Sequence, residues 1–307
     1  MLKRTPAILL CLIFLCCPLF FFTGCHSKSD SSEEPPVFSP PQFLVPQSPG
    51  TDTLGQSPLV LDISNVSQGY LTAESEDNGT AKNIQLTSED GTVYSYFLKS
   101  GEKAVLPFTS GSGTYQISCY EQISGSQYAA LFAQTLEISL ENEFLPFLYP
   151  NQYVNFSPES NASKLALSLL ADDATDQEGI ETIYNYVTQH ITYDERKAST
   201  VESGYLPDVD ETLASGTGIC FDYAALMTAM LRSRDIPCKL QIGFAGDIKH
   251  AWIDVYIRGK GWVDHAITYD GEQWNRMDPT FTANSDNREI INSYIGDSDN
   301  YTLQFTR

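Results

Sequence analysis

Two hydrophobic patterns divide most of this sequence of 307 residues. Between residues 58 and 145, apolar and polar positions alternate in short runs rich in β-branched and aromatic residues, such as 92–99 and 113–122. This period of two is typical of half-buried strands. Turn signals, among them Asn78-Gly79 and Asp90-Gly91, separate the runs. We therefore expect six or seven short strands in a small antiparallel β-sandwich of the immunoglobulin-like kind.

From about residue 150 the apolar positions follow a helical spacing instead. Ile180, Ile183 and Val187 lie three or four positions apart and would share one buried face of a helix over 176–191. Two further helices are expected. The sequence places them at 161–171 and 219–233.

Strand-like runs come after the last of these helices. They occupy 238–245, 250–258, 262–268 and 274–277, with glycine-containing turns between them. Helices that precede an antiparallel sheet predict an α+β domain. The domain would span residues 149–307, after a β-sandwich over 58–148.

The first 24 residues predict an export signal. Lys3 and Arg4 precede an uncharged and largely apolar stretch over 7–22, which is shorter than an ordinary membrane-spanning helix. We expect residues 1–24 to be removed when the protein leaves the cytoplasm.

The signal ends in small residues placed directly before a cysteine. Thr23, Gly24 and Cys25 resemble the lipobox of bacterial lipoproteins, although Phe22 stands where that pattern prefers Leu. The resemblance implies that Cys25 carries a lipid such as palmitate and anchors the protein to the membrane, in the cell envelope. The alternative is a plain secreted protein in which Cys25 is incidental.

Proline content and net charge are informative beyond the signal. Seven of the 16 prolines fall between Pro35 and Pro58, so residues 25–57 are expected to form an extended stalk. The whole chain carries 18 Lys and Arg against 39 Asp and Glu, a net charge of −21. Nucleic-acid binding needs cations to displace counterions, so this charge argues against a nucleic-acid partner.

One cysteine stands where a nucleophile is expected. Cys220 begins the helix predicted at 219–233, directly after a flexible run that includes Gly216 and Gly218. Free amides and the positive end of a helix favour thiolate over thiol. The backbone N–H of Cys220 is also a candidate donor to an oxyanion. The alternative for Cys220 is a structural cysteine at a helix end.

A thiolate nucleophile needs a base and a group that orients the base. His250 begins a predicted strand after a polar loop, from which an imidazole can reach a neighbouring helix end. Asp278 ends a later strand, just before Pro279. The alternative for His250, taken alone, is a strand-end histidine bonded to a backbone carbonyl.

Three ordered blocks carry a resemblance to a known family. The segments GTGICFDYAALMTAMLRSRDIPCKLQIGF, HAWIDVY and MDPTF, preceded by HITYDE, resemble the transglutaminase-like superfamily, in particular its exported bacterial branch. This resemblance covers roughly residues 160–285 and implies a papain-like fold. It further implies a triad in which Cys220 is the nucleophile, His250 the base and general acid, and Asp278 the orienting carboxylate.

Some assignments within this resemblance stay open. An extra hairpin-like segment lies between His250 and Asp278, so Asp264 is a competing orienting group. Gly218 and Tyr193 are candidates for the oxyanion site or the cleft, although buried packing explains Tyr193 equally well. The chain contains no calcium loop of the D-x-[DN]-x-[DN]-G type, so we expect no metal and no cofactor.

The sequence thus predicts a membrane-tethered cysteine enzyme that acts on amide bonds of peptides or proteins. Transglutaminase, deamidase and peptidase activities share the same thioester intermediate, and the residues do not choose among them. The alternative is a non-catalytic surface module in which the β-sandwich binds a partner.

Overall fold

The computed structural model describes residues 42–263, 267–269, 274–276 and 301–307. The predicted signal, the predicted lipid-attachment residue Cys25 and the first part of the predicted stalk therefore lie outside the described residues. Residues Phe38–Arg307 form one unit through their internal contacts, so the domain boundary expected at residue 148 stays a prediction.

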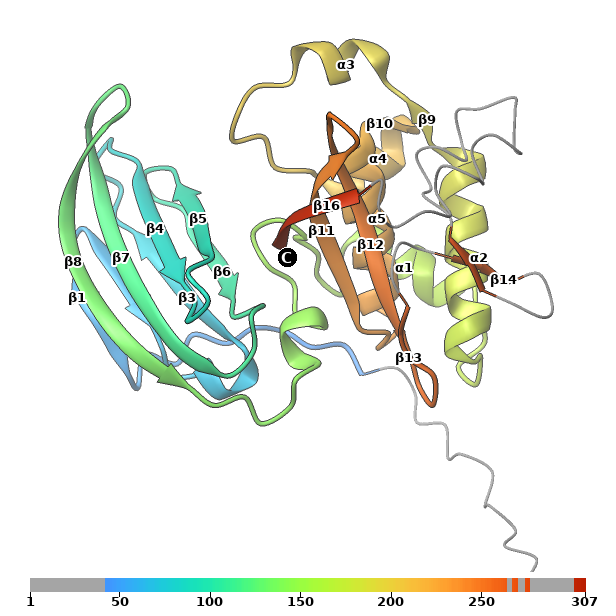
Figure 1. The fold of residues 1–307 in the computed structure, drawn as a ribbon, viewed down its shortest axis with the longest axis horizontal. Coiled ribbons are helices and arrows are strands. Elements are labelled where there is room, and N and C mark those ends of the chain that lie inside the picture. The colour runs from blue at the N-terminus through green and yellow to red at the C-terminus, as the bar shows by residue number, and fades with distance from the viewer. Residues whose placement is uncertain (1–41, 264–266, 270–273, 277–300) are drawn as a thin grey trace, which may run out of the picture. The chain divides into compact units, whose positions relative to one another are not determined.

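Eight strands build the first part of this unit as two antiparallel sheets of four strands each (Figure 1). The strand orders are β1-β2-β3-β6 and β5-β4-β7-β8. The strands are β1 Thr53–Gln56, β2 Leu59–Asp62, β3 Tyr70–Ser75, β4 Lys82–Thr87, β5 Val93–Leu98, β6 Lys103–Pro107, β7 Gly113–Ser124 and β8 Gln127–Ile138. A short 3-10 helix, η1 (Val66–Gln68), precedes β3.

One hydrophobic core joins the two sheets. Leu61 and Leu71 of the first sheet and Ile84 and Tyr96 of the second belong to the same buried cluster, and each is fully buried. Each such side chain contributes about 1.5–3 kcal/mol by leaving water. The predicted small antiparallel sandwich ahead of an α+β domain is confirmed.

The end of the predicted stalk differs from the expectation, because it belongs to the sandwich. Strand β1 pairs with β2, although it falls within 25–57. The residues just before it are also fixed: the backbone N–H of Gly50 donates to Asp62 Oδ2 at 2.6 Å, and that of Gln47 donates to Tyr70 Oη at 2.8 Å. Strands can pair through their backbone hydrogen bonds with few apolar side chains. The polar, proline-rich composition of this segment therefore gave no sign that it contains a strand.

The helices occupy the positions that the periodicity predicted. They are α1 Asn161–Ser168, α2 Asp176–His190 and α5 Cys220–Arg232. At the start of α2, Glu178 N–H donates to Thr175 Oγ1 at 3.2 Å and Thr175 N–H donates to Glu178 Oε2 at 2.8 Å. This reciprocal pair is a capping box.

Two short helices and a two-residue parallel pair were not predicted. The helices are α3 Glu195–Thr200 and α4 Val209–Ser215, and the paired strands are β9 Thr192–Tyr193 and β10 Thr217–Gly218. Each helix starts at an aspartate that accepts backbone hydrogen bonds, Asp194 for α3 and Asp208 for α4. A 3-10 helix, η2 (Leu145–Phe147), lies between the sandwich and α1.

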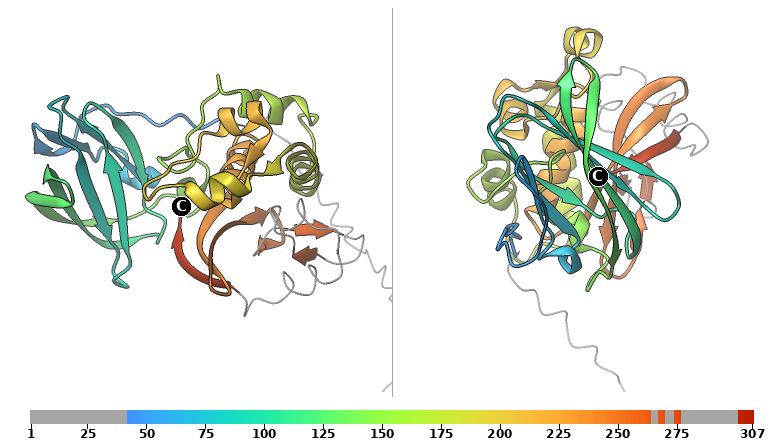
Figure 2. Two further views of the ribbon diagram at one scale, coloured as in Figure 1. Left: turned by 90° about the horizontal axis from the view of Figure 1, so that it is seen from above. Right: turned by 90° about the vertical axis from the view of Figure 1, so that its left-hand side faces the viewer.

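Another antiparallel sheet comes after the helices, with the strand order β13-β12-β11-β16. Its strands are β11 Cys238–Ala245, β12 Ile248–Ile257, β13 Gly261–Val263 and β16 Tyr301–Thr306, and a separate pair is formed by β14 Ile267–Tyr269 and β15 Trp274–Arg276. Figure 2 shows the helices of this part on one side of the sheet. Residues of α2, α5, β11 and β12 share one buried core. None of the helices in the described residues is long and apolar enough to cross a membrane.

Candidate active site

Cys220 is the first residue of α5, as the sequence predicted. The residue is partly exposed, whereas Cys119 and Cys238 are both 0% exposed. Burial raises the pKa of each of those two thiols to about 12. Among the described cysteines, Cys220 is therefore the one that solvent can reach.

Gly218 and Tyr193 lie side by side just before this helix. They are register partners in the parallel pair of β9 and β10, and the Asp194 N–H donates to the carbonyl oxygen of Gly218 at 2.9 Å. A Cβ added at Gly218 would meet the Cβ of Asp222 at 2.6 Å, a distance that real side chains do not adopt. Glycine is therefore required where the chain enters α5.

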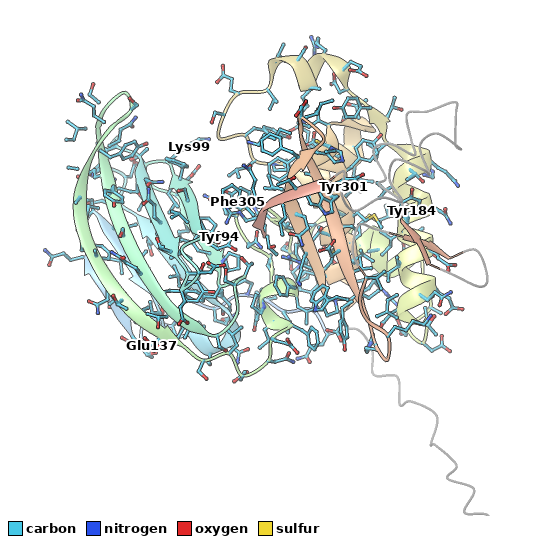
Figure 3. All side chains as sticks on the ribbon, in the orientation of Figure 1. Tyr94, Lys99, Glu137, Tyr184, Tyr301 and Phe305 are labelled. Atoms are coloured by element: carbon cyan, nitrogen blue, oxygen red, sulfur yellow. The ribbon has the colours of Figure 1, made fainter. Side chains whose placement is uncertain are left out.

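His250 is the third residue of β12 and is 6% exposed. Its ring lies 6.3 Å from that of Trp252 at an interplanar angle of 18°, and 6.3 Å from that of Tyr301 on β16, which Figure 3 labels. The next residue, Ala251, belongs to the core that β12 shares with α5. The imidazole thus lies in an aromatic setting on a strand that packs against the helix of Cys220.

Chain geometry places Cys220 and His250 toward the same end of this helix–sheet layer. The far end of α5 is tied to the start of β11, since Arg232 Nε and Nη2 donate to the carbonyl oxygen of Cys238 at 3.0 and 2.8 Å. Measured from Arg232 at this end of the layer, Cys220 lies about 18 Å away along the helix axis. Gly243, the register partner of His250, lies about 17 Å along β11.

Neither candidate for the orienting carboxylate is among the described residues. Asp278 and its competitor Asp264 both lie in segments outside the description, so their roles stay predictions. Within the described part of the chain, no group of three or more His, Cys, Asp or Glu side chains is placed to hold a metal ion.

A buried polar network next to Cys220 was not predicted. Asp222, which is 0% exposed, accepts from the backbone N–H of Ile219 at 2.8 Å. Its carboxylate also binds Lys197 Nζ at 2.7 Å and accepts from Tyr205 Oη at 2.5 Å. Lys197 Nζ donates to Tyr205 Oη at 2.7 Å, which closes the network.

The charges in this network reinforce one another. Burial alone would lower the pKa of Lys197, but its hydrogen bonds to Asp222 and Tyr205 outweigh burial and raise it. Burial, and then the hydrogen bond to Asp222, raise the pKa of Tyr205 to about 12. The network links the segment after β9 to the first turn of α5. In the sequence, only the position of Asp222 two residues after Cys220 hinted at it.

The family comparison agrees with this architecture. Residues 163–279 match the model of the Transglutaminase-like superfamily. The chain contains a transglutaminase-like domain. The matched range includes Cys220, His250 and Asp278, and the family expected from the sequence is confirmed. A search of the curated proteins finds no match to the chain.

Three solved structures resemble the chain that contains this transglutaminase-like domain. One is described as "a Putative Cysteine Protease from Cytophaga hutchinsonii" (14% identity, TM-score 0.37), covering 78% of this chain and 79% of that one. A second, "a putative protease" from Parabacteroides distasonis, has 11% identity and a TM-score of 0.29, covering 68% of this chain and 62% of that one. The third, red sea bream transglutaminase, has 14% identity and a TM-score of 0.28, covering 71% of this chain and 48% of that one. The chain thus spans less than two thirds of the length of the latter two.

Proposed function

We propose that this protein is a cysteine enzyme that acts on amide bonds of peptides or proteins. The observation that carries the proposal is the position and exposure of Cys220. Within a transglutaminase-like domain, it is a partly exposed cysteine at a helix start, two residues after a glycine whose place no larger residue can take without a shift, while the other described cysteines are fully buried. A reactive cysteine needs this combination of access and a positive helix end.

In the proposed reaction, the Cys220 thiolate attacks the carbonyl carbon of an amide. The backbone N–H of Cys220 stabilises the oxyanion that forms, and Gly218 and Tyr193 are assigned to the oxyanion site or the substrate cleft. The carbon–nitrogen bond then breaks, and the nitrogen takes a proton from the His250 imidazolium as it leaves. The acyl group remains on Cys220 as a thioester. Asp278 is assigned to orient His250.

A second nucleophile resolves the thioester. Water or a primary amine attacks the acyl carbon, His250 accepts its proton, and the sulfur leaves as thiolate. An amine gives a new amide, as in a transglutaminase. Water gives a carboxylic acid, as in a deamidase or a peptidase. The net charge of −21 favours basic acceptors weakly, through long-range steering.

The proposed place of action is the cell envelope, outside the cytoplasm. Removal of residues 1–24 would leave Cys25 as a lipid-bearing N-terminus, and the proline-rich segment after it would hold the folded unit away from the bilayer. Replacing Cys25 with Ala should release the protein from the membrane fraction. Unchanged membrane association of Cys25→Ala would contradict the anchor.

The reaction is tested with residues 38–307, the unit that holds both cores. The protein is incubated with glutamine-containing peptides and a primary amine, and the products are read by mass spectrometry. Addition of the amine indicates transfer, a gain of about one dalton indicates deamidation, and shorter peptides indicate proteolysis. Cys220→Ala should abolish every product, while Cys119→Ala should leave them unchanged. Products that persist in Cys220→Ala would refute the proposal.

A further inference from the structure

The outer face of the sheet β5-β4-β7-β8 has an unusual composition. Along β5, Tyr94 and Tyr96 point into the sandwich core, so Val93, Ser95 and Phe97 point outward. The strand registers extend these three positions into rows that cross all four strands. We call these rows the neutral face: Phe97, Asn83, Tyr120 and Ala130; Ser95, Gln85, Ser118 and Ala133; Val93, Thr87, Gln116 and Thr135.

The neutral face carries no charge at neutral pH, although the chain has a net charge of −21. Among the described residues, charged groups follow at its two ends: Lys99 comes after the end of β5, and Glu137 stands one row beyond Thr135 (Figure 3). An anionic partner would meet an acidic protein without a counter-charge here, and a cationic one would find better sites elsewhere.

Aromatic rings gather at one end of the face. Phe97 is 51% exposed, and the ring of Tyr128 approaches it to 6.4 Å between centroids, edge to face. Tyr120 lies two strands away from Phe97, about 10 Å across the sheet. Register shifts in the β7–β8 pair, the first of them next to Tyr120, bend this part of the sheet. The rings therefore offer apolar faces within reach of one ligand.

Neutral hydrogen-bonding groups lie beside these rings. The Gln85 Nε2 donates to Asn83 Oδ1 at 3.0 Å, which fixes that amide pair. The side chains of Ser95, Gln116 and Ser118 have no hydrogen-bond partner among the described residues, and all three are at least partly exposed. Aromatic faces next to unpaired hydroxyl and amide groups suit a ligand that is apolar on one side and rich in hydroxyl groups on the other.

We propose that the neutral face binds an uncharged glycan. Pyranose rings present C–H groups on their faces, which stack on aromatic side chains, and hydroxyl groups at their edges, which pair with amides and hydroxyls. A surface that binds another protein ordinarily has an apolar centre and a polar, charged rim. The face instead mixes apolar and polar positions row by row. This binding is independent of the chemistry at Cys220.

The test is native gel electrophoresis of residues 38–307 through gels that contain one polymer each: hydroxyethyl cellulose, glycol chitin, xylan, mannan or dextran. Alginate, an anionic polymer, serves as the charged comparison. We expect at least one neutral polymer to retard the protein and alginate not to. Phe97→Ala combined with Tyr120→Ala should weaken that retardation at least fivefold.

Controls separate binding from folding. Leu167→Ala, which removes an exposed apolar side chain from α1, should leave the retardation unchanged. Phe97→Tyr should retain it, because an aromatic ring remains. Each variant is used only if its thermal unfolding matches that of the parent protein. The absence of retardation by all five neutral polymers would overturn the proposal. Retardation of the double variant equal to that of the parent protein would also overturn it. So would a parent protein that no polymer retards but that forms a dimer in solution, if the double variant disrupts that dimer.

Discussion

At the scale of single residues, the three described cysteines are the clearest guide to function. We expect iodoacetamide at pH 8 to label Cys220 in the folded protein at least a hundredfold faster than Cys119 or Cys238, because those two thiols are buried and keep their protons at this pH. Peptide mapping by mass spectrometry measures the three rates.

His250→Ala should slow the labelling of Cys220 if the imidazole accepts the proton of the thiol. A Cys220 that reacts no faster than a small model thiol would favour the non-catalytic surface module instead. Comparable labelling of Cys238 would contradict the structure itself, since that residue is fully buried.

The salt bridge at Asp222 makes a second prediction at this scale. Lys197→Met leaves a fully buried carboxylate without its counter-charge, so unfolding should become easier by about 2–3 kcal/mol, a value reduced because Lys197 is partly exposed. Lys197→Arg should lose less stability than Lys197→Met, because it keeps the positive charge. Thermal or urea unfolding measures the difference, and equal stability of Lys197→Met and the parent would contradict it.

This salt bridge should also depend on pH in a defined direction. The pKa values of Lys197 and Tyr205 are raised in the fold, so their stabilisation is complete below the unfolded values and is lost as pH rises through the folded ones. The stability difference between the parent and Lys197→Met should therefore shrink from pH 9 toward pH 12. A difference that grows over this range would refute the assignment.

At the scale of elements, those with a strong period or a local signature were predictable. Strand β11 occupies 238–245, as its sequence predicted, and α2 begins at its capping box. By contrast, β16 becomes a strand by pairing with β11, and that partner cannot be read from residues 301–306 themselves. The short helix α3 is likewise held by Asp194 and by tertiary contacts rather than by periodicity.

The candidate site likewise contains residues that a local sequence pattern reveals and residues that it does not. Cys220 and Gly218 could be found from the sequence because a glycine run before a helix is a local pattern. Lys197 and Tyr205 could not, since a salt bridge to Asp222 depends on how a non-periodic segment crosses the start of α5.

The entrance to α5 makes a third prediction. Gly218→Ala puts a Cβ 2.6 Å from that of Asp222, so the start of the helix must shift. We expect a loss of about 1–3 kcal/mol in stability and a larger fractional loss in the labelling rate of Cys220. Gly204→Ala is the control, because a Cβ there meets open space and only backbone strain is added. An unchanged labelling rate in Gly218→Ala would show that the helix entrance tolerates the shift.

At the scale of the whole molecule, Arg307 contacts residues of both the sandwich core and the helix–sheet core. Its guanidinium lies 4.3 Å from the ring centroid of Tyr153 and donates to Tyr96 Oη at 3.2 Å, while Thr109 Oγ1 donates to the carbonyl oxygen of Thr306 at 2.9 Å. The ring of Phe305 also meets that of Tyr94 at 6.1 Å (Figure 3). Side chains of the sandwich thus hold the strand that flanks β11.

Arg307→Met should weaken this connection. Losing the cation–ring contacts and hydrogen bonds should cost about 1–3 kcal/mol and separate the unfolding of the sandwich from that of the transglutaminase-like domain. Differential scanning calorimetry should then resolve two transitions, whereas we expect one for the parent protein. A single transition at an unchanged temperature would contradict this role for Arg307.

The uneven access of solvent to the sulfur atoms has a practical consequence. Peroxide oxidises accessible cysteines before buried ones, so Cys220 should be oxidised to sulfenic acid long before the two buried cysteines react. A sample prepared in air without dithiothreitol would then be well folded, full length and inactive. Failure to turn over a substrate is informative only after reduction has restored the thiol.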